Sequence, residues 1–237
     1  MFPSGSDVLS ARRDPSLVVL EGLHAVKHAV RFGAAVERVV VEDRDVAAAL
    51  AARVAPDVAD AIVGRAEVAE DFRALSPRPV PTGVIAVVRR PAARAIGDGH
   101  VVLLEDSRDL GNVGACVRVA AAAGAAGVVT TGDRDPWAPE ALRGSAGLHF
   151  ALPVHRGDPP RGRPLVALDP EGDPFAPTAV PPDAVLAFGT ERDGLSDALK
   201  AAADAVLALP MAPGVSSLNL ATSVAATLYA LKLAADR

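Results

Sequence analysis

The chain has 237 residues, of which 50% are hydrophobic and 22% are charged, and this balance excludes an intrinsically disordered chain. The length is sufficient for two small domains or one large domain. Aromatic residues make up only 3% of the chain, so the core must be built mainly from Ala, Val and Leu.

Cysteine and histidine usage argues against disulfides and metals. The single cysteine, Cys116, cannot form an internal disulfide, and the five histidines lack metal-ligand spacing. The first fifteen residues contain no apolar stretch typical of a signal peptide. Residues 205–231 carry no charge, but prolines and polar residues interrupt them, which argues against a membrane span. We therefore expect a cytoplasmic protein that has no metal and does not contact a membrane.

The formal net charge is −5, and the negative charge is concentrated in the C-terminal part of the chain. Bulk charge therefore does not indicate a nucleic-acid partner, and any contact with phosphate must be local. Most basic residues are arginines, whose planar side chains suit bidentate phosphate contacts.

In the N-terminal part, short apolar runs alternate with helical patterns. Strands are predicted at residues 17–20, 38–43 and 83–88. Helical patterns cover residues 23–33 and 45–54, and an amphipathic pattern covers 67–75. Residues 89–100 combine charge, Pro and Gly without periodicity. We therefore predict a smaller α/β domain over residues 1–95 and a second domain over residues 96–237.

The second part alternates more clearly between strands and helices. Strands are predicted at residues 101–105, 127–131, 165–168, 184–189 and 205–210. A helix follows the first strand, and a final helix runs from about Ser217 to Ala235. Strands that are apolar throughout predict a parallel sheet covered on both faces, with ligands beyond the carboxyl ends of the strands. The predicted fold class is α/β.

The final helix is apolar on nearly all sides, so it requires two covering surfaces. One is its own sheet, and a second subunit is the economical candidate for the other. The alternative is burial of this helix wholly within one domain.

Three loops that follow predicted strands concentrate Gly, Asn and Ser, at residues 106–118, 188–196 and 209–225. Neither the GxGxxG pattern nor the phosphate-loop pattern occurs among them. The segment GVSSL matches a nucleophile elbow only loosely, because Leu218 stands where that motif needs glycine. Dinucleotide, phosphate-loop and hydrolase chemistry are therefore not supported.

The same loops resemble, in order and spacing, the three motifs of the SpoU-type (TrmH-like) RNA 2′-O-ribose methyltransferases of the SPOUT, or alpha/beta-knot, superfamily. The resembling segments are GNVGACVR (111–118), GTERDGL (189–195) and PMAPGVSSLN (210–219). Further similarity at ALRGSAGLHFALPV (141–154), EGLHAV (21–26) and PTGVIAVV (81–88) extends the resemblance over nearly the whole chain.

The resemblance implies a deep trefoil knot in a parallel-sheet catalytic domain, and S-adenosylmethionine (AdoMet) bound there in a bent conformation. It also implies a homodimer packed partly through the last helix, and an N-terminal domain that binds RNA. Such an auxiliary domain favours structured ribosomal RNA over tRNA.

Residue matching also implies roles for individual side chains. The implied catalytic residues are Arg118, Asn112, Glu191, Ser217 and Asn219. The implied cofactor contacts are Gly189, Leu209, Met211 and Leu218, for which core burial is the simpler interpretation of the two leucines. Candidate phosphate contacts are Arg143, Arg12, Arg13, Arg89 and Arg90, although scattered surface arginines are usually only solvated.

Physical chemistry restricts two of these roles. The Arg118 guanidinium is always protonated, so we expect it to bind an RNA phosphate and the developing alkoxide rather than to act as a base. Ser217 either hydrogen-bonds substrate or caps the final helix. Two positions depart from the family pattern: Leu110 stands where proline is common, and Pro213 removes an N–H that could have contacted cofactor.

Three alternative functions remain open on the sequence. One is a methyltransferase that acts on tRNA. Another is a noncatalytic RNA-binding or assembly factor that retains the fold. The third is a methyltransferase for a small molecule or a protein.

Overall fold

The computed structural model describes residues 6–190 and 193–236 and divides into two compact units. The first unit contains the residues up to Ala92 together with Trp137–Ala151. The second contains Ala93–Pro136 and the chain from Leu152 onward. A segment from the second half of the sequence therefore packs as part of the first unit.

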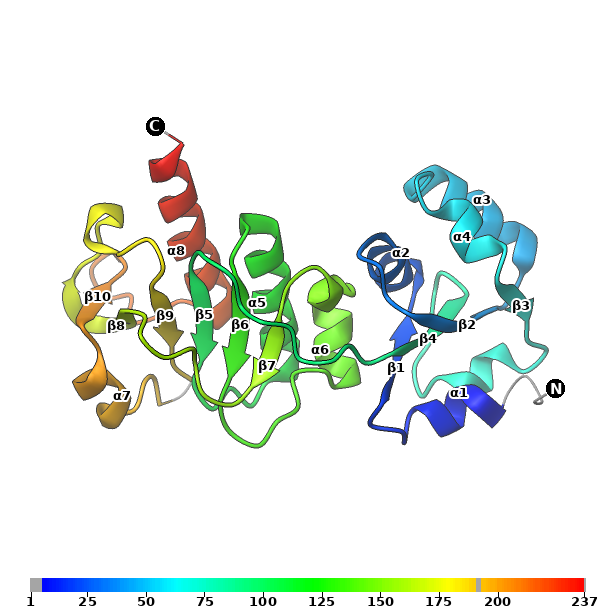
Figure 1. The fold of residues 1–237 in the computed structure, drawn as a ribbon, viewed down its shortest axis with the longest axis horizontal. Coiled ribbons are helices and arrows are strands. Elements are labelled where there is room, and N and C mark those ends of the chain that lie inside the picture. The colour runs from blue at the N-terminus through cyan, green and yellow to red at the C-terminus, as the bar shows by residue number, and fades with distance from the viewer. Residues whose placement is uncertain (1–5, 191–192, 237) are drawn as a thin grey trace. The chain divides into compact units, whose positions relative to one another are not determined.

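The first unit is built on a four-stranded sheet in the order β1-β4-β2-β3 (Figure 1). Its strands are β1 (Leu17–Glu21), β2 (Val36–Val41), β3 (Ala66–Val68) and β4 (Val84–Arg89). Strand β4 pairs antiparallel with β1 and β2, whereas β2 and β3 are parallel. Its helices are α1 (Ser6–Ala11), α2 (Leu23–Arg31), α3 (Arg44–Val54), α4 (Ala59–Val63) and α6 (Pro139–Gly144).

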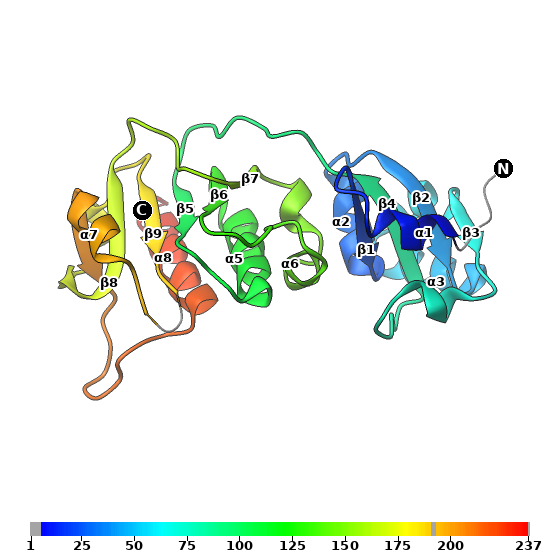
Figure 2. The same ribbon diagram turned by 90° about the horizontal axis from the view of Figure 1, so that it is seen from below.

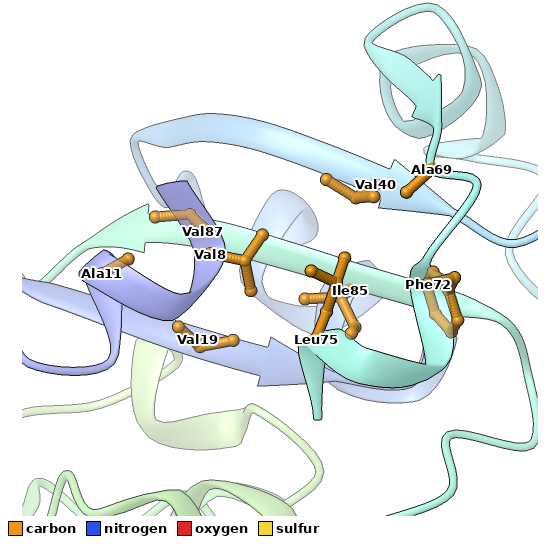
Figure 3. Packing of buried hydrophobic residues seen from close by; sticks show 9 residues of the cluster. All are labelled: Val8, Ala11, Val19, Val40, Ala69, Phe72, Leu75, Ile85 and Val87. Atoms are coloured by element: carbon orange, nitrogen blue, oxygen red, sulfur yellow. The ribbon is translucent and has the colours of Figure 1, made fainter. Parts of the chain in front are cut away.

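One face of this sheet carries a compact hydrophobic core (Figure 3). Val19, Val40 and Ile85 project from β1, β2 and β4 toward Val8 of α1 and Phe72 of a 3₁₀ helix (Phe72–Leu75). The amphipathic stretch over residues 67–75 is therefore not one continuous helix. Its first residues belong to strand β3, and its last four form the 3₁₀ helix. Phe72 and Leu75 are three residues apart, so they lie on the same face of this helix, and both are buried.

The second unit contains a six-stranded sheet in the order β10-β8-β9-β5-β6-β7, and every pairing in it is parallel. The strands are β5 (Val101–Leu104), β6 (Gly127–Thr130), β7 (Val154–Arg156), β8 (Leu165–Pro174), β9 (Val185–Phe188) and β10 (Ala205–Ala208). Its helices are α5 (Leu110–Ala123), α7 (Asp197–Ala202) and α8 (Leu220–Ala235). The predicted parallel sheet and α/β class are confirmed.

The two long helices of this unit, α5 and α8, pack side by side (Figure 1). Helix α5 begins at Asp109, whose side chain accepts a hydrogen bond from the backbone N–H of Asn112, and it ends at Gly124 with a positive φ of 85°. Helix α8 begins at Asn219, whose Oδ1 accepts bonds from the backbone N–H groups of Ala221 and Thr222. The interpretation of Ser217 as the cap of this helix is therefore wrong, because Asn219 performs that role.

Helix α8 is not wholly covered within one chain. Its residues Leu220, Val224 and Leu228 are buried, but Tyr229 and Leu233 are 41% and 60% exposed. The alternative that this helix is buried entirely within one domain is therefore wrong. None of the helices formed by the described residues is both long and apolar enough to cross a membrane.

Candidate active site

A cleft of about 520 Å³ lies beside the middle of β8 and the carboxyl ends of β9 and β10, at the edge of a parallel sheet where ligands usually bind. All four residues predicted to contact cofactor line it: Gly189, Leu209, Met211 and Leu218. Ser217, a predicted catalytic residue, lines it as well. The second and third of the three predicted loops therefore meet at one cavity.

The wall after β9 has no room for a side chain at Gly189. Thr190 and Gly194 exchange backbone hydrogen bonds of 3.0 and 3.2 Å, which closes a tight loop. A Cβ atom at Gly189 would lie 2.0 Å from the carbonyl carbon of Gly194. Backbone is consequently exposed to the cleft at this point. The predicted catalytic residue Glu191 lies outside the described residues.

The loop after β10 contains a tight turn at the position where the sequence departs from the family pattern. The N–H of Val215 donates to the carbonyl of Ala212 over 3.1 Å, and Gly214 has a φ of 84°. Proline followed by a glycine with positive φ is typical of a type II turn. Figure 2 shows this connection as a long loop between β10 and α8. Pro213, which departs from the family pattern, is thus part of a defined turn.

A side-chain hydrogen bond joins the first loop to the third. Nδ2 of Asn219 donates to Oδ1 of Asn112 over 3.2 Å, although the two residues are 107 positions apart. The two predicted catalytic asparagines are therefore together, next to Ser217 and Leu218. Arg118 lies further along α5, where it is exposed, and it is not among the residues that line the cleft.

The structure adds polar cleft residues that the sequence analysis did not identify. Asp169 and Glu171 come from the continuation of β8, and Lys200 comes from α7. Lys200 Nζ lies 3.7 Å from Oδ2 of Asp169 and 3.5 Å from Oδ1 of Asp197. The negative charge of Asp169 is the main cause that raises the pKa of Lys200 above its ordinary value. In the sequence, the polar segment 169–173, directly after the apolar residues 165–168, was the feature that could have indicated Asp169 and Glu171.

The arginines predicted to bind RNA mostly have partners inside the first unit. Arg12 and Arg143 both pair with Glu21, at 2.6 and 2.9 Å. Arg89 pairs with a glutamate of β2 at 2.5 Å, and the guanidinium of Arg90 lies 5.8 Å from the ring centroid of Trp137. Arg13 is exposed. Intramolecular packing thus accounts for four of these five side chains, and their contact with RNA stays a prediction.

One unit has an all-parallel sheet with a cleft at its carboxyl edge, and the other has a smaller mixed sheet, which defines a two-unit α/β protein with a small-ligand site. The model of the SpoU rRNA methylase family matches residues 99–229, which is more than half of the chain. The chain therefore belongs to the SpoU rRNA methylase family, and the resemblance found in the three loops is confirmed.

Individual proteins are similar to this chain in sequence or in fold. The chain is 28% identical over 233 residues to the 23S rRNA (guanosine(2553)-2′-O)-methyltransferase RlmP of Bacillus subtilis, which covers 93% of this chain and 90% of that protein. The structure of the SpoU methyltransferase AviRb from Streptomyces viridochromogenes, in complex with AdoMet, matches with a TM-score of 0.77 at 24% identity over 99% of both chains. An AdoMet-bound rRNA methyltransferase from Sinorhizobium meliloti matches with a TM-score of 0.76 at 25% identity over 98% of this chain and 95% of that chain. The knot implied by the resemblance stays a prediction.

Proposed function

We propose that this protein transfers a methyl group from AdoMet to a ribose 2′-hydroxyl of ribosomal RNA. The observation that carries the proposal is that all four cofactor residues expected from the family motifs line one cleft. Residues 96–237 carry out the transfer, and residues 1–95 recognise the RNA. We also propose that the protein acts in the cytoplasm.

The cleft fits the methyl donor in size and in chemistry. Its volume of about 520 Å³ lies within the usual range for small-molecule sites. The apolar side chains of Leu209 and Leu218, with the bare backbone at Gly189, form walls suited to a flat purine. Among the described lining residues, three are acidic (Asp169, Glu171 and Asp193) and one, Lys200, is basic. The cleft therefore favours a ligand of net positive charge.

When bound, AdoMet supplies an electrophilic methyl group on a sulfonium. Transfer would break the bond between this methyl carbon and the sulfonium sulfur, leaving the thioether S-adenosylhomocysteine, and would join the carbon to the ribose oxygen, whose hydroxyl proton must leave. Arg118 cannot accept that proton, because its guanidinium is always protonated. It holds the RNA phosphate and stabilises the developing alkoxide, and the neighbouring phosphate helps to accept the proton.

The asparagine pair positions the reacting loops. Asn219 uses Oδ1 to cap α8 and Nδ2 to bond Asn112, so it fixes the third loop against the start of α5. Ser217 does not cap α8 and lines the cleft, so we expect its hydroxyl to hydrogen-bond the substrate. Glu191 belongs to the same proposal as a support for the cofactor loop.

The proposal is tested by radiolabelled methyl transfer from AdoMet to ribosomal RNA and to tRNA, followed by nucleoside analysis of the digested product. We expect a 2′-O-methylated nucleoside from ribosomal RNA. Arg118→Lys keeps the charge but loses the planar fork, and we expect it to lower turnover at saturating RNA. Bound RNA without transfer would instead identify a noncatalytic factor, and transfer to tRNA alone would reassign the substrate.

We also propose a homodimer that covers the exposed side of α8. The exposure of Tyr229 and Leu233 on an otherwise apolar helix supports this arrangement.

A further inference from the structure

The cleft lining contains a pair of opposite charges, formed by Lys200 and Asp169. The Asp169 side chain is 9% exposed and that of Lys200 is 28% exposed, so both are largely withdrawn from bulk water. Carboxylates are rarely buried without a partner. The rest of the lining mixes apolar, hydroxyl and acidic side chains, and Lys200 is the single cation among the described lining residues, so this pair is where the cleft offers both signs of charge side by side.

The local fold of β8 places Asp169 in the cleft. Along β8 the pairing with β10 jumps, because Val206 pairs with Ala167 whereas Leu207 pairs with Asp173. The residues between these two pairs therefore bulge out of the ladder at the carboxyl edge of the sheet. Gly172 permits this geometry, since a Cβ there would lie 2.6 Å from the backbone of Val206.

The ammonium of Lys200 retains donors for a ligand. Its distances to Asp169 and Asp197, 3.7 and 3.5 Å, are longer than good N–H···O hydrogen bonds, and an ammonium group has three donors. Oδ1 of Asp169 accepts one bond of 3.0 Å from the backbone N–H of Glu171. A carboxylate accepts several bonds, so Asp169 also keeps capacity toward the cleft.

We propose that Lys200 and Asp169 bind the amino-acid end of the methyl donor, Lys200 through the α-carboxylate and Asp169 through the α-ammonium. This inference rests on the proposed function. The α-carboxylate is the only negatively charged group of AdoMet, so it is the only part that can form an ion pair with Lys200. A cation and an anion side by side match a zwitterion in both signs, whereas a purine or a ribose offers no anion to the lysine.

The test compares two neutral analogues by calorimetry on the full chain. S-adenosylhomocysteine keeps the amino-acid end, and 5′-methylthioadenosine lacks it but keeps the nucleoside. We expect Lys200→Gln to weaken S-adenosylhomocysteine binding by about tenfold, the size typical of one lost charge-assisted hydrogen bond. Binding of methylthioadenosine should change less than about twofold. Asp169→Asn should show the same selectivity, and Lys200→Arg should restore part of the affinity.

Asp197→Asn is the matched control, because Asp197 also pairs with Lys200 but is fully exposed and does not line the cleft. We expect it to leave both affinities unchanged. Equal weakening of both analogues by Lys200→Gln, or weakening of neither, would overturn the inference while leaving the cofactor site in place. Failure of the unaltered protein to bind either analogue would overturn the proposed function itself. Thermal unfolding without ligand shows whether each variant is folded.

Discussion

Glu21 links helix α6 to the N-terminal sheet through an ion pair with Arg143. Its carboxylate, at the end of β1, accepts bonds from Arg12 (2.6 Å), Ser76 (2.8 Å) and Arg143 (2.9 Å). Its side chain is only 6% exposed. Arg143 comes from the segment Trp137–Ala151, so one buried carboxylate ties together three distant parts of the sequence.

Replacing Glu21 with Gln removes the charge and keeps nearly the same shape. Breaking a buried ion pair costs about 3–5 kcal/mol when the remaining charge stays buried. Here the arginine side chains are 17% and 28% exposed, and Arg12 also donates to the carbonyl of Leu75, so both guanidiniums can recover part of their solvation. We therefore expect Glu21→Gln to lower the free energy of unfolding by about 2–3 kcal/mol.

Urea unfolding followed by circular dichroism measures this loss. The double mutant with Arg143→Gln isolates the pair, and we expect a coupling energy of about 1–2 kcal/mol. Asp57→Asn removes an exposed ion pair with Arg31 in the same unit, and it should have a much smaller effect. A loss below about 0.5 kcal/mol for Glu21→Gln would refute the reasoning, since that is the range of ordinary surface substitutions.

The same residue predicts a dependence on pH. Burial acts to raise the pKa of Glu21, but the hydrogen bonds from Ser76, Arg12 and Arg143 outweigh it, and the pKa lies below its ordinary value of 4.5. The stabilisation is therefore present above about pH 4.5 and is lost as the pH falls through the lower, folded-state value. Glu21→Gln should flatten the loss of stability below pH 4.5. An unchanged acid limb would show that other carboxylates control it.

Three further predictions concern other parts of the chain. Gly189→Ala places a methyl group 2.0 Å from the carbonyl carbon of Gly194, so the loop must move, and calorimetry should detect at least about a tenfold loss of S-adenosylhomocysteine binding. Tyr229→Glu combined with Leu233→Glu should give a monomer by light scattering, and an unchanged mass would refute a dimer through α8. Burial lowers the pKa of His28 below 6.5, so stability should fall as the pH drops below 6.5, and His28→Gln should remove that slope in urea titrations.

The parallel sheet could be predicted because its strands are short and apolar throughout. Val101–Leu104 and Val185–Phe188 are buried at every position, as strands covered on both faces must be. The meeting of the loops after β9 and β10 also followed from the sequence, because the carboxyl ends of parallel strands share one edge. The bond between Asn112 and Asn219 could be expected only from the family motifs, since no local pattern links residues 107 positions apart.

The packing of Trp137–Ala151 with the N-terminal sheet gave no local signal. Gly147 has a φ of 77°, and a Cβ there would lie 2.4 Å from the carbonyl oxygen of Ala25. The carbonyl of Ala146 in turn bonds Nδ1 of His28 over 2.8 Å. These contacts join residues more than a hundred positions apart, and hydrophobic periodicity carries information only about neighbours along the chain.

The charged cleft residues of β8 could not be predicted from the sequence for a related reason. Strand β8 continues to Pro174, but its sequence turns from apolar to polar after Leu168, at the point where it bulges into the cleft. A strand that leaves the core to line a ligand site loses the apolar pattern by which strands are predicted. Backbone geometry at three neighbouring strands thus shapes the site. Strand β8 has a bulge, β9 is followed by Gly189 with no room for a side chain, and the loop after β10 contains a Pro-Gly turn. These backbone features determine which side chains line the cleft. The pairing of Asp169 with Lys200 in the cleft can therefore be recognised only from the structure.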